Sequence, residues 1–177
     1  MDFLAQRAET VVRFQGGSNA GHTVTAGGKE YKLRLMPSGI LFADKHNIIG
    51  NGVAFSPKVF FEELDNLKKA GVSDPQIFVS DRAQVVMPYH TLLDALTDEA
   101  RDGGGIGTTK NGVGPCYMDR DQRIGIRVCD LLEEDTFAAK LKGNLAAKNE
   151  IITKVYDHTP LSYDEIFAEY KAYAQKL

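Results

Sequence analysis

Short apolar runs in the first eighty positions of the chain predict β-strands. A compact run at 10–15 has the length and character of a buried strand, and alternating apolar and polar residues at 22–26 and 30–35 predict a hairpin. Two further short strands are expected at 47–50 and 76–80. Because helical patterns separate these strands, the first hundred residues favour the α/β class.

Two helices are predicted by their start and stop signals and by apolar residues three or four positions apart. Ser56 followed by Pro57 is typical of a helix start, with serine as N-cap and proline at the first helical position, and Gly71 is expected to end that helix. Its expected apolar face consists of Val59, Phe60, Leu64 and Leu67. A second helix is predicted at 90–101.

The residue composition and the predicted secondary structure change after residue 101. The segment 102–115 is too rich in glycine for a regular element, and the chain beyond about Asp130 contains few strand patterns and several helical ones. Ser162 and Glu165 form a candidate capping box for the last helix. We therefore expect a sheet-containing first part and a mainly helical second part.

Composition narrows the function classes. The 177 residues are 43% hydrophobic and 25% charged, which is ordinary for a globular protein, and the net charge of -3 argues against nucleic acid as a partner. The two cysteines, Cys116 and Cys129, lack the spacing of a structural zinc site and predict reduced thiols. With neither a long apolar run nor a signal-peptide pattern, a cytoplasmic protein is expected.

The most informative segment runs from an apolar strand into two glycines and then into Asn19, Ala20, Gly21 and His22. Glycines let the main chain approach a ligand closely, and histidine has an unperturbed pKa near neutrality. Further glycine-bearing motifs follow in order at 37–41, 48–53, 106–109 and 112–115. Together, these segments resemble the adenylosuccinate synthetase family, with the similarity dense from about Asp2 to about Leu132.

The resemblance implies an α/β fold: part of a P-loop NTPase-like, mostly parallel sheet with a mainly helical insertion subdomain. We expect residues 1–101 to form the partial sheet domain with the loop around His22, and residues 102–177 to form the glycine-rich IMP loop and the helical subdomain. Family members carry a phosphate-binding loop upstream of the match and guanine- and aspartate-binding segments further downstream. The chain is therefore expected to be an internal fragment whose incomplete sheet exposes apolar surface.

The resemblance also implies an enzymatic activity, the GTP-dependent ligation of IMP and L-aspartate to adenylosuccinate in AMP biosynthesis. By family correspondence, His22 would be the catalytic acid near the transferred phosphate, and the carbonyl of Gly21 would contact Mg²⁺. Arg123 would reach the IMP phosphate of the partner subunit in a homodimer. The implied IMP-binding residues are Asn19, Ala20, Gly21, His22, Thr109 and Arg123.

Taken without the family, the same residues have plainer interpretations. His22 is typical of a hydrogen-bonded surface or core histidine, the loop at Thr109 of a flexible surface turn, and Arg123 of a solvated arginine. Many family members have Gly-Arg where this chain has Lys110 and Asn111, which removes a cation near the ligand loop.

Two function classes therefore stay open at this point. In the first, the chain is part of the ligase and is inactive in isolation, because it lacks the phosphate loop. In the second, it is a non-catalytic module that binds a purine nucleotide or acts in assembly.

Overall fold

The computed structural model describes residues 2–26, 28–72, 74–101 and 107–177. The chain forms two compact units, Met1–Ala83 and Gln84–Leu177. Each unit is described by itself below, and the domain boundary predicted after Arg101 stays a prediction. None of the helices in the described part of the chain combines the length and apolar character needed to span a bilayer.

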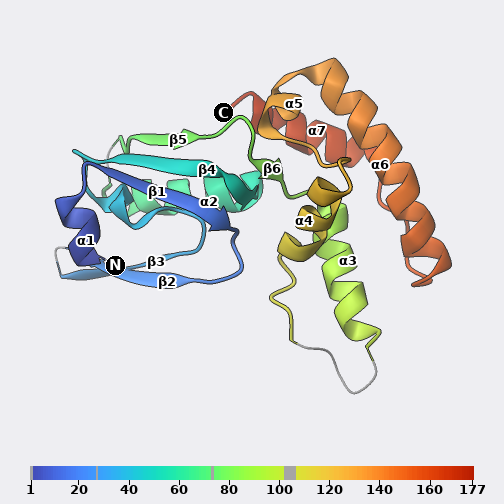
Figure 1. Cartoon of the computed structure of the whole chain (residues 1–177), viewed down its shortest axis with the longest axis horizontal. Helices are drawn as coiled ribbons and strands as arrows, with labels where there is room; N and C mark the ends of the chain where they lie inside the picture. Colours follow the sequence, from blue (N-terminus) through green and yellow to red (C-terminus); the bar gives the residue numbers. More distant parts are fainter. Residues whose placement is uncertain (1, 27, 73, 102–106) are drawn as a thin grey trace. The chain divides into compact units, whose positions relative to one another are not determined.

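The first unit contains a parallel sheet in the order β1-β4-β5, with β4 in the centre (Figure 1). The strands are β1 (Thr10–Gly16), β4 (His46–Phe55) and β5 (Ile77–Val79). The α/β prediction is confirmed, but the strand predicted at 47–50 was too short. Glycine and asparagine disfavour strands in isolation, and tertiary packing extends β4 through them.

Glycines of the 48–53 motif allow this extension because β1 lies very close to β4. A Cβ atom on Gly52 would lie 2.3 Å from the carbonyl oxygen of Phe14, which is too close for any side chain. The register of the two strands shifts between Arg13 and Gln15 at the same place. Gly52 is therefore a packing requirement of the sheet.

One face of this sheet carries exposed apolar side chains. Val12, Ile48 and Phe78 are register partners across the three strands, so they share that face. Val12 is 49% exposed, Phe78 54%, and Phe14, two positions along β1, 66%. The expectation of exposed apolar surface is met on β1 and β5.

A two-stranded antiparallel hairpin leads from β1 toward β4. It consists of β2 (His22–Ala26) and β3 (Lys29–Leu33), and His22 pairs with Leu33. The short helices α1 (Asp2–Arg7) and η1 (Ser38–Leu41) pack on each other, and η1 also packs on β1 and β4. The hairpin was predicted, although β3 ends at Leu33 rather than at residue 35.

Helix α2 (Pro57–Lys69) begins and ends as predicted. The Oγ of Ser56 accepts a hydrogen bond from the Val59 amide at 3.4 Å, and Gly71 follows the C-cap with a φ of 94°. Its buried face differs from the prediction, because Glu63 is buried and Leu64 is only half-buried. The buried residues of α2 are Pro57, Val59, Phe60, Glu63 and Leu67.

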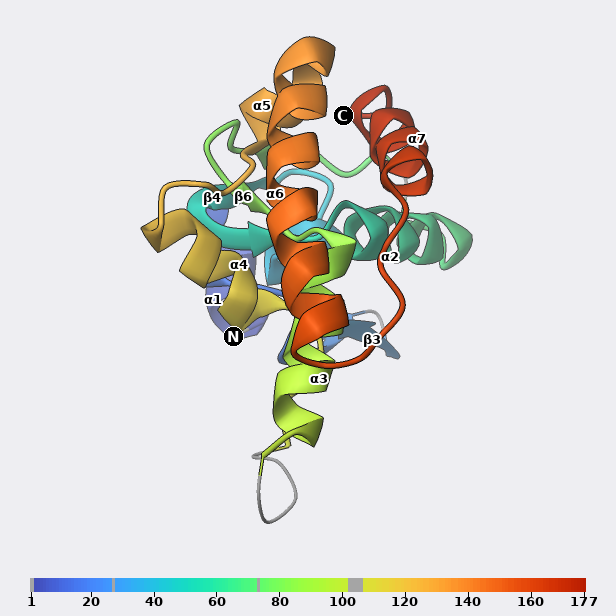
Figure 2. The same cartoon turned by 90° about the vertical axis from the view of Figure 1, so that its right-hand side faces the viewer.

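The second unit is mainly helical, and the helices expected beyond about Asp130 are present. Its elements are β6 (Gln84–Val85), α3 (Pro88–Glu99), α4 (Val113–Asp121), α5 (Val128–Leu132), α6 (Glu134–Lys154) and α7 (Tyr163–Ala174). The long helix α6 packs on α3, α5 and α7 (Figure 2). Aromatic and aliphatic side chains such as Tyr89, Phe137 and Leu141 form the core of this unit.

Two helix boundaries in this unit differ from the predictions. Helix α3 begins at Pro88 rather than at His90, because proline suits the first turn of a helix. Helix α4 begins at Val113, inside the glycine-rich segment predicted to lack regular structure. Residues 102–106 of that segment lie outside the described residues. The Oγ of Ser162 accepts a hydrogen bond from the Glu165 amide, as predicted for the N-cap of α7.

Candidate functional site

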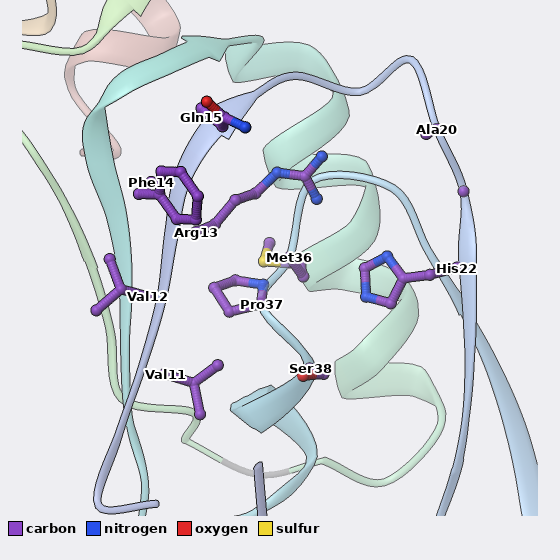
Figure 3. Close-up of a pocket in the computed structure, with 11 residues that line it drawn as sticks. Val11, Val12, Arg13, Phe14, Gln15, Ala20, His22, Met36, Pro37 and Ser38 are labelled. Carbon is purple, nitrogen blue, oxygen red and sulfur yellow. The ribbon is translucent and has the colours of Figure 1, made fainter. Parts of the chain in front are cut away.

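A pocket of about 340 Å³ lies in the first unit, beside β1 and the loop that follows it (Figure 3). Its volume is within the range of small-molecule sites, about 300–1,000 Å³. Strand β1, the loop, the start of β2 and the segment 36–38 supply its walls. The lining residues are Val11, Val12, Arg13, Phe14, Gln15, Ala20, Gly21, His22, Met36, Pro37 and Ser38.

The loop between β1 and β2 is buried at its base and exposed at its tip. Gly16 turns the chain with a φ of 79°, and Gly17 and Ser18 are buried. Asn19, Ala20 and Gly21 are exposed. The tip therefore presents backbone groups toward solvent on a fixed base.

The imidazole of His22 lies at the first position of β2 and is half-buried. It points toward Met36 and Pro37 across the pocket (Figure 3). Because His22 pairs with Leu33 in the hairpin, its backbone position is set by the β2–β3 ladder. The ring can therefore reach a bound molecule as a hydrogen-bond donor or acceptor.

The structure brings together only part of the predicted site. Ala20, Gly21 and His22 line the pocket, whereas Asn19 lies on the same loop outside the lining. Thr109 and Arg123 belong to the second unit, and both are exposed. Their expected roles stay predictions.

The loop that carries Arg123 is held by backbone hydrogen bonds. The amides of Ile124 and Gly125 both donate to the carbonyl of Asp119, each at 3.0 Å. Arg123 has a φ of 65°, in the left-handed region that a non-glycine residue adopts at some cost. The guanidinium of Arg123 is therefore presented from a tightly closed turn.

The Thr108–Thr109 segment also has local order. The Thr108 hydroxyl accepts a hydrogen bond from the Lys110 amide at 3.3 Å, and Lys110 has a φ of 53°. The Lys110 amine binds Glu99 at 2.8 Å. The Lys110 side chain therefore forms an exposed ion pair next to this segment.

Buried charges connect three helices of the second unit. Asp119 on α4 accepts hydrogen bonds from His90 of α3, at 2.9 Å, and from Lys148 of α6. His90 Nδ1 accepts the Met87 amide at 3.0 Å, so Nε2 carries the proton donated to Asp119. Burial lowers the pKa of His90, which keeps the imidazole neutral. This cluster has the bonding pattern of a structural network.

No group of three or more histidine, cysteine or acidic side chains that could hold a metal ion occurs among the residues that the structure describes. Both cysteines are free thiols, and burial raises the pKa of Cys116 to about 12.

The fold and the pocket define an α/β protein with a pocket of small-molecule size beside a glycine-bearing loop at the end of a parallel strand. A family model described as adenylosuccinate synthetase matches residues 1–177, the whole chain. The chain therefore belongs to the adenylosuccinate synthetase family.

Relatives and a solved structure agree with this assignment. The adenylosuccinate synthetase of Clostridium beijerinckii is 57% identical over 178 residues, which cover 99% of this chain and 42% of that protein. That of Lactiplantibacillus plantarum is 56% identical over 176 residues, 99% of this chain and 41% of that protein. The fully ligated adenylosuccinate synthetase of Plasmodium falciparum matches with a TM-score of 0.84 and 29% identity, covering 99% of this chain and 41% of that chain. The chain thus spans about two fifths of the length of these proteins.

Two residues with clear structural links to the pocket had no assigned role in the sequence interpretation. Arg13 lines the pocket, and Glu63 binds backbone amides next to it. Glu63 stands three positions after Phe60 and four before Leu67, on the apolar face of α2. An acidic residue at such a position is the signal that could have identified it, because a buried carboxylate needs hydrogen-bond partners.

Proposed function

We propose that this chain forms the IMP-binding part of an enzyme that joins IMP and L-aspartate to adenylosuccinate with GTP as co-substrate. The observation that carries the proposal is the pocket lined by Ala20, Gly21 and His22 in a chain of the adenylosuccinate synthetase family. The loop tip, with its exposed backbone and amide side chain at Asn19, suits a polar, planar ligand such as a purine nucleotide.

His22 is the residue of this chain best suited to the chemical step. When a phosphoryl group is transferred to IMP, negative charge develops on the transferring and leaving oxygens. An imidazole at the pocket wall can donate a hydrogen bond or a proton to such an oxygen near neutral pH. The half-buried position of His22 supports this role, since partial exclusion of water strengthens the interaction.

Mg²⁺ would be held only partly by this chain. The carbonyl of Gly21 is an oxygen ligand of the right type, and the exposed loop tip leaves room for phosphate and water oxygens to complete the shell. When bound, the ion would neutralise phosphate charge.

Thr109 and Arg123 would contact the IMP phosphate, Thr109 through its hydroxyl and Arg123 as a bidentate donor from the partner subunit of a homodimer. A cytoplasmic location accords with such a metabolic role. Dimerisation would give the exposed guanidinium of Arg123 a phosphate ligand on the partner subunit.

Calorimetric titration of the chain with IMP tests the proposal. We expect saturable binding, weakened about tenfold or more by Arg123→Ala, because a charge-assisted hydrogen bond to phosphate contributes about 1.5–3 kcal/mol. Arg120→Ala is the matched control, since Arg120 lies three positions earlier in the last turn of α4 and pairs with Asp121. His22→Asn should also weaken binding, whereas His158→Asn, at an exposed site, should not.

Either of two results would contradict the proposal. One is the absence of IMP binding by protein that circular dichroism shows to be folded. The other is an equal loss of affinity in Arg120→Ala and Arg123→Ala, which would indicate a general charge effect.

A further inference from the structure

One buried carboxylate binds three consecutive backbone amides next to the pocket. Glu63 is 6% exposed, and its carboxylate oxygens accept hydrogen bonds from the amides of Arg34, Leu35 and Met36. The Leu35 and Met36 distances are 2.8 and 3.0 Å. Burying a carboxylate is costly unless several donors compensate it. The path of the chain after β3 is therefore set by Glu63.

The segment held by Glu63 is itself connected to the loop. The carbonyl of Arg34 accepts a hydrogen bond from one terminal nitrogen of Arg13, and the carbonyl of Gly17 accepts one from the other. Arg13 lies on β1, and its side chain extends across the pocket wall (Figure 3). A continuous series of polar contacts thus runs from α2 through the segment 34–36 and Arg13 to the base of the loop.

This series of contacts adjoins the segments that form two walls of the pocket. The segment held by Glu63 continues directly into Met36, Pro37 and Ser38, which form one wall. Gly17 is at the base of the loop that carries Gly21 and His22, the opposite wall. The spacing of the two walls therefore depends on contacts made by Arg13 and Glu63.

We propose that Glu63 and Arg13 are positioning residues that hold the two walls of the nucleotide pocket in their binding geometry. Glu63 does not line the pocket, so it acts only through the segment 34–36. Arg13 lines it, but both terminal nitrogens of its guanidinium donate to backbone carbonyls. As far as it concerns IMP, this inference rests on the proposed function.

The alternative role for Arg13 is direct attraction of a ligand phosphate by its charge. Lysine separates the two roles, because it keeps the charge but cannot bridge two carbonyls as a planar guanidinium does. If Arg13 acts by positioning, Arg13→Lys and Arg13→Met will behave alike. If it acts by charge, Arg13→Lys will behave like the unsubstituted chain.

The first arm of the test measures hydrogen exchange without any ligand. In Glu63→Gln we expect the amides at 17–22 and 34–36 to exchange about tenfold faster or more, because bonds to a charged acceptor are lost. Glu62→Gln is the matched control, since Glu62 is the preceding residue on the same helix and its carboxylate is exposed beside Arg34 at 3.7 Å. Arg13→Lys should also accelerate exchange at 17–22. Because it removes no buried charge, it is the variant to use if Glu63→Gln does not fold.

The second arm measures IMP affinity in the same variants. We expect Glu63→Gln and Arg13→Lys each to weaken binding about tenfold, and the double variant to lose little more than either alone, because both act through one connection. Additive losses would overturn the proposal, as would unchanged exchange at 17–22 in both variants. Faster exchange at 17–22 in a chain that does not bind IMP would support the positioning role and reject the proposed function instead.

Discussion

The two units of the molecule bury charged groups in different ways. In the first unit, the carboxylate of Glu63 binds backbone amides of a segment remote in sequence. In the second, the carboxylate of Asp119 binds the side chains of His90 and Lys148, each from another helix. The first arrangement fixes the course of irregular chain around a pocket, and the second joins regular elements to one another.

The difference follows from which polar groups need hydrogen-bond partners in each unit. A segment without regular structure leaves backbone amides without partners, and an anion can satisfy several of them together. Helices satisfy their own backbone groups, so a buried acid between them needs side-chain donors. Burial of a charge therefore serves loop geometry in one unit and helix packing in the other.

The largest expected effect is loss of the charge cluster in the second unit. Asp119→Asn should lower the free energy of unfolding by about 3–5 kcal/mol, because it leaves Lys148, whose side chain is 13% exposed, without its carboxylate partner. Urea unfolding followed by circular dichroism at a helix wavelength would measure it. Asp121→Asn is the control, since its ion pair with Arg120 is exposed, and it should leave the midpoint of urea unfolding nearly unchanged. Equal effects of the two variants would contradict a special role for the buried cluster.

A smaller effect, with opposite signs in the two units, is expected from adding a methyl group to glycine. Gly52→Ala should destabilise the first unit by about 1–3 kcal/mol, because the new Cβ would meet the Phe14 carbonyl. Gly143→Ala in α6 should stabilise the second unit by about 0.5–1 kcal/mol, because the new Cβ would meet no atom beyond the adjacent helix backbone and alanine favours helix. The midpoints of urea unfolding would report both. A neutral Gly52→Ala would mean that β1 and β4 can separate without cost.

The smallest effect is the pH dependence of the second unit between pH 7 and 5. The pKa of His90 is lowered first by burial, and the contact with Asp119 only partly opposes this. The unfolded chain therefore takes up a proton below about pH 6.5 that the folded chain does not, so stability falls as the pH falls.

The pKa of Asp119 extends this loss to lower pH. Burial alone would raise this pKa, but the hydrogen bonds from His90 and Lys148 prevail and lower it. The stability that the ionised carboxylate contributes is therefore lost as Asp119 is protonated in acid. His90→Gln should flatten the dependence between pH 7 and 5 in urea titrations. His158→Gln, at an exposed site, should leave it as in the unsubstituted chain, and a flattening there would argue against His90 as the source.

Local signals in the sequence predicted the elements that are locally determined. The N-cap at Ser56, the helix end at Gly71 and the hairpin beginning at His22 all follow from residues adjacent in the chain. The length of β4 could not be predicted in the same way, because Gly50 and Gly52 look like strand ends until β1 is placed beside them.

The candidate site shows the same division. The grouping of Ala20, Gly21 and His22 was predictable, since one loop carries all three. The opposite wall was not predictable. The hairpin and the contact with Glu63 place the 37–41 motif beside the pocket, and Glu63 lies 27 residues from Met36. Likewise, Asp119 and its two partners are each 29 residues apart, and nothing in the spacing of the sequence connects them.

The exposed side chains of Val12, Phe14 and Phe78 have a consequence for the thermodynamics of the chain. Apolar groups that are hydrated in the folded state contribute little to the heat-capacity increase on unfolding, which comes from newly hydrated apolar surface. The increment should therefore be smaller than a chain of this length ordinarily gives. Its stability curve would then be broad and shallow, with folding free energy that changes little between cold and ambient temperature.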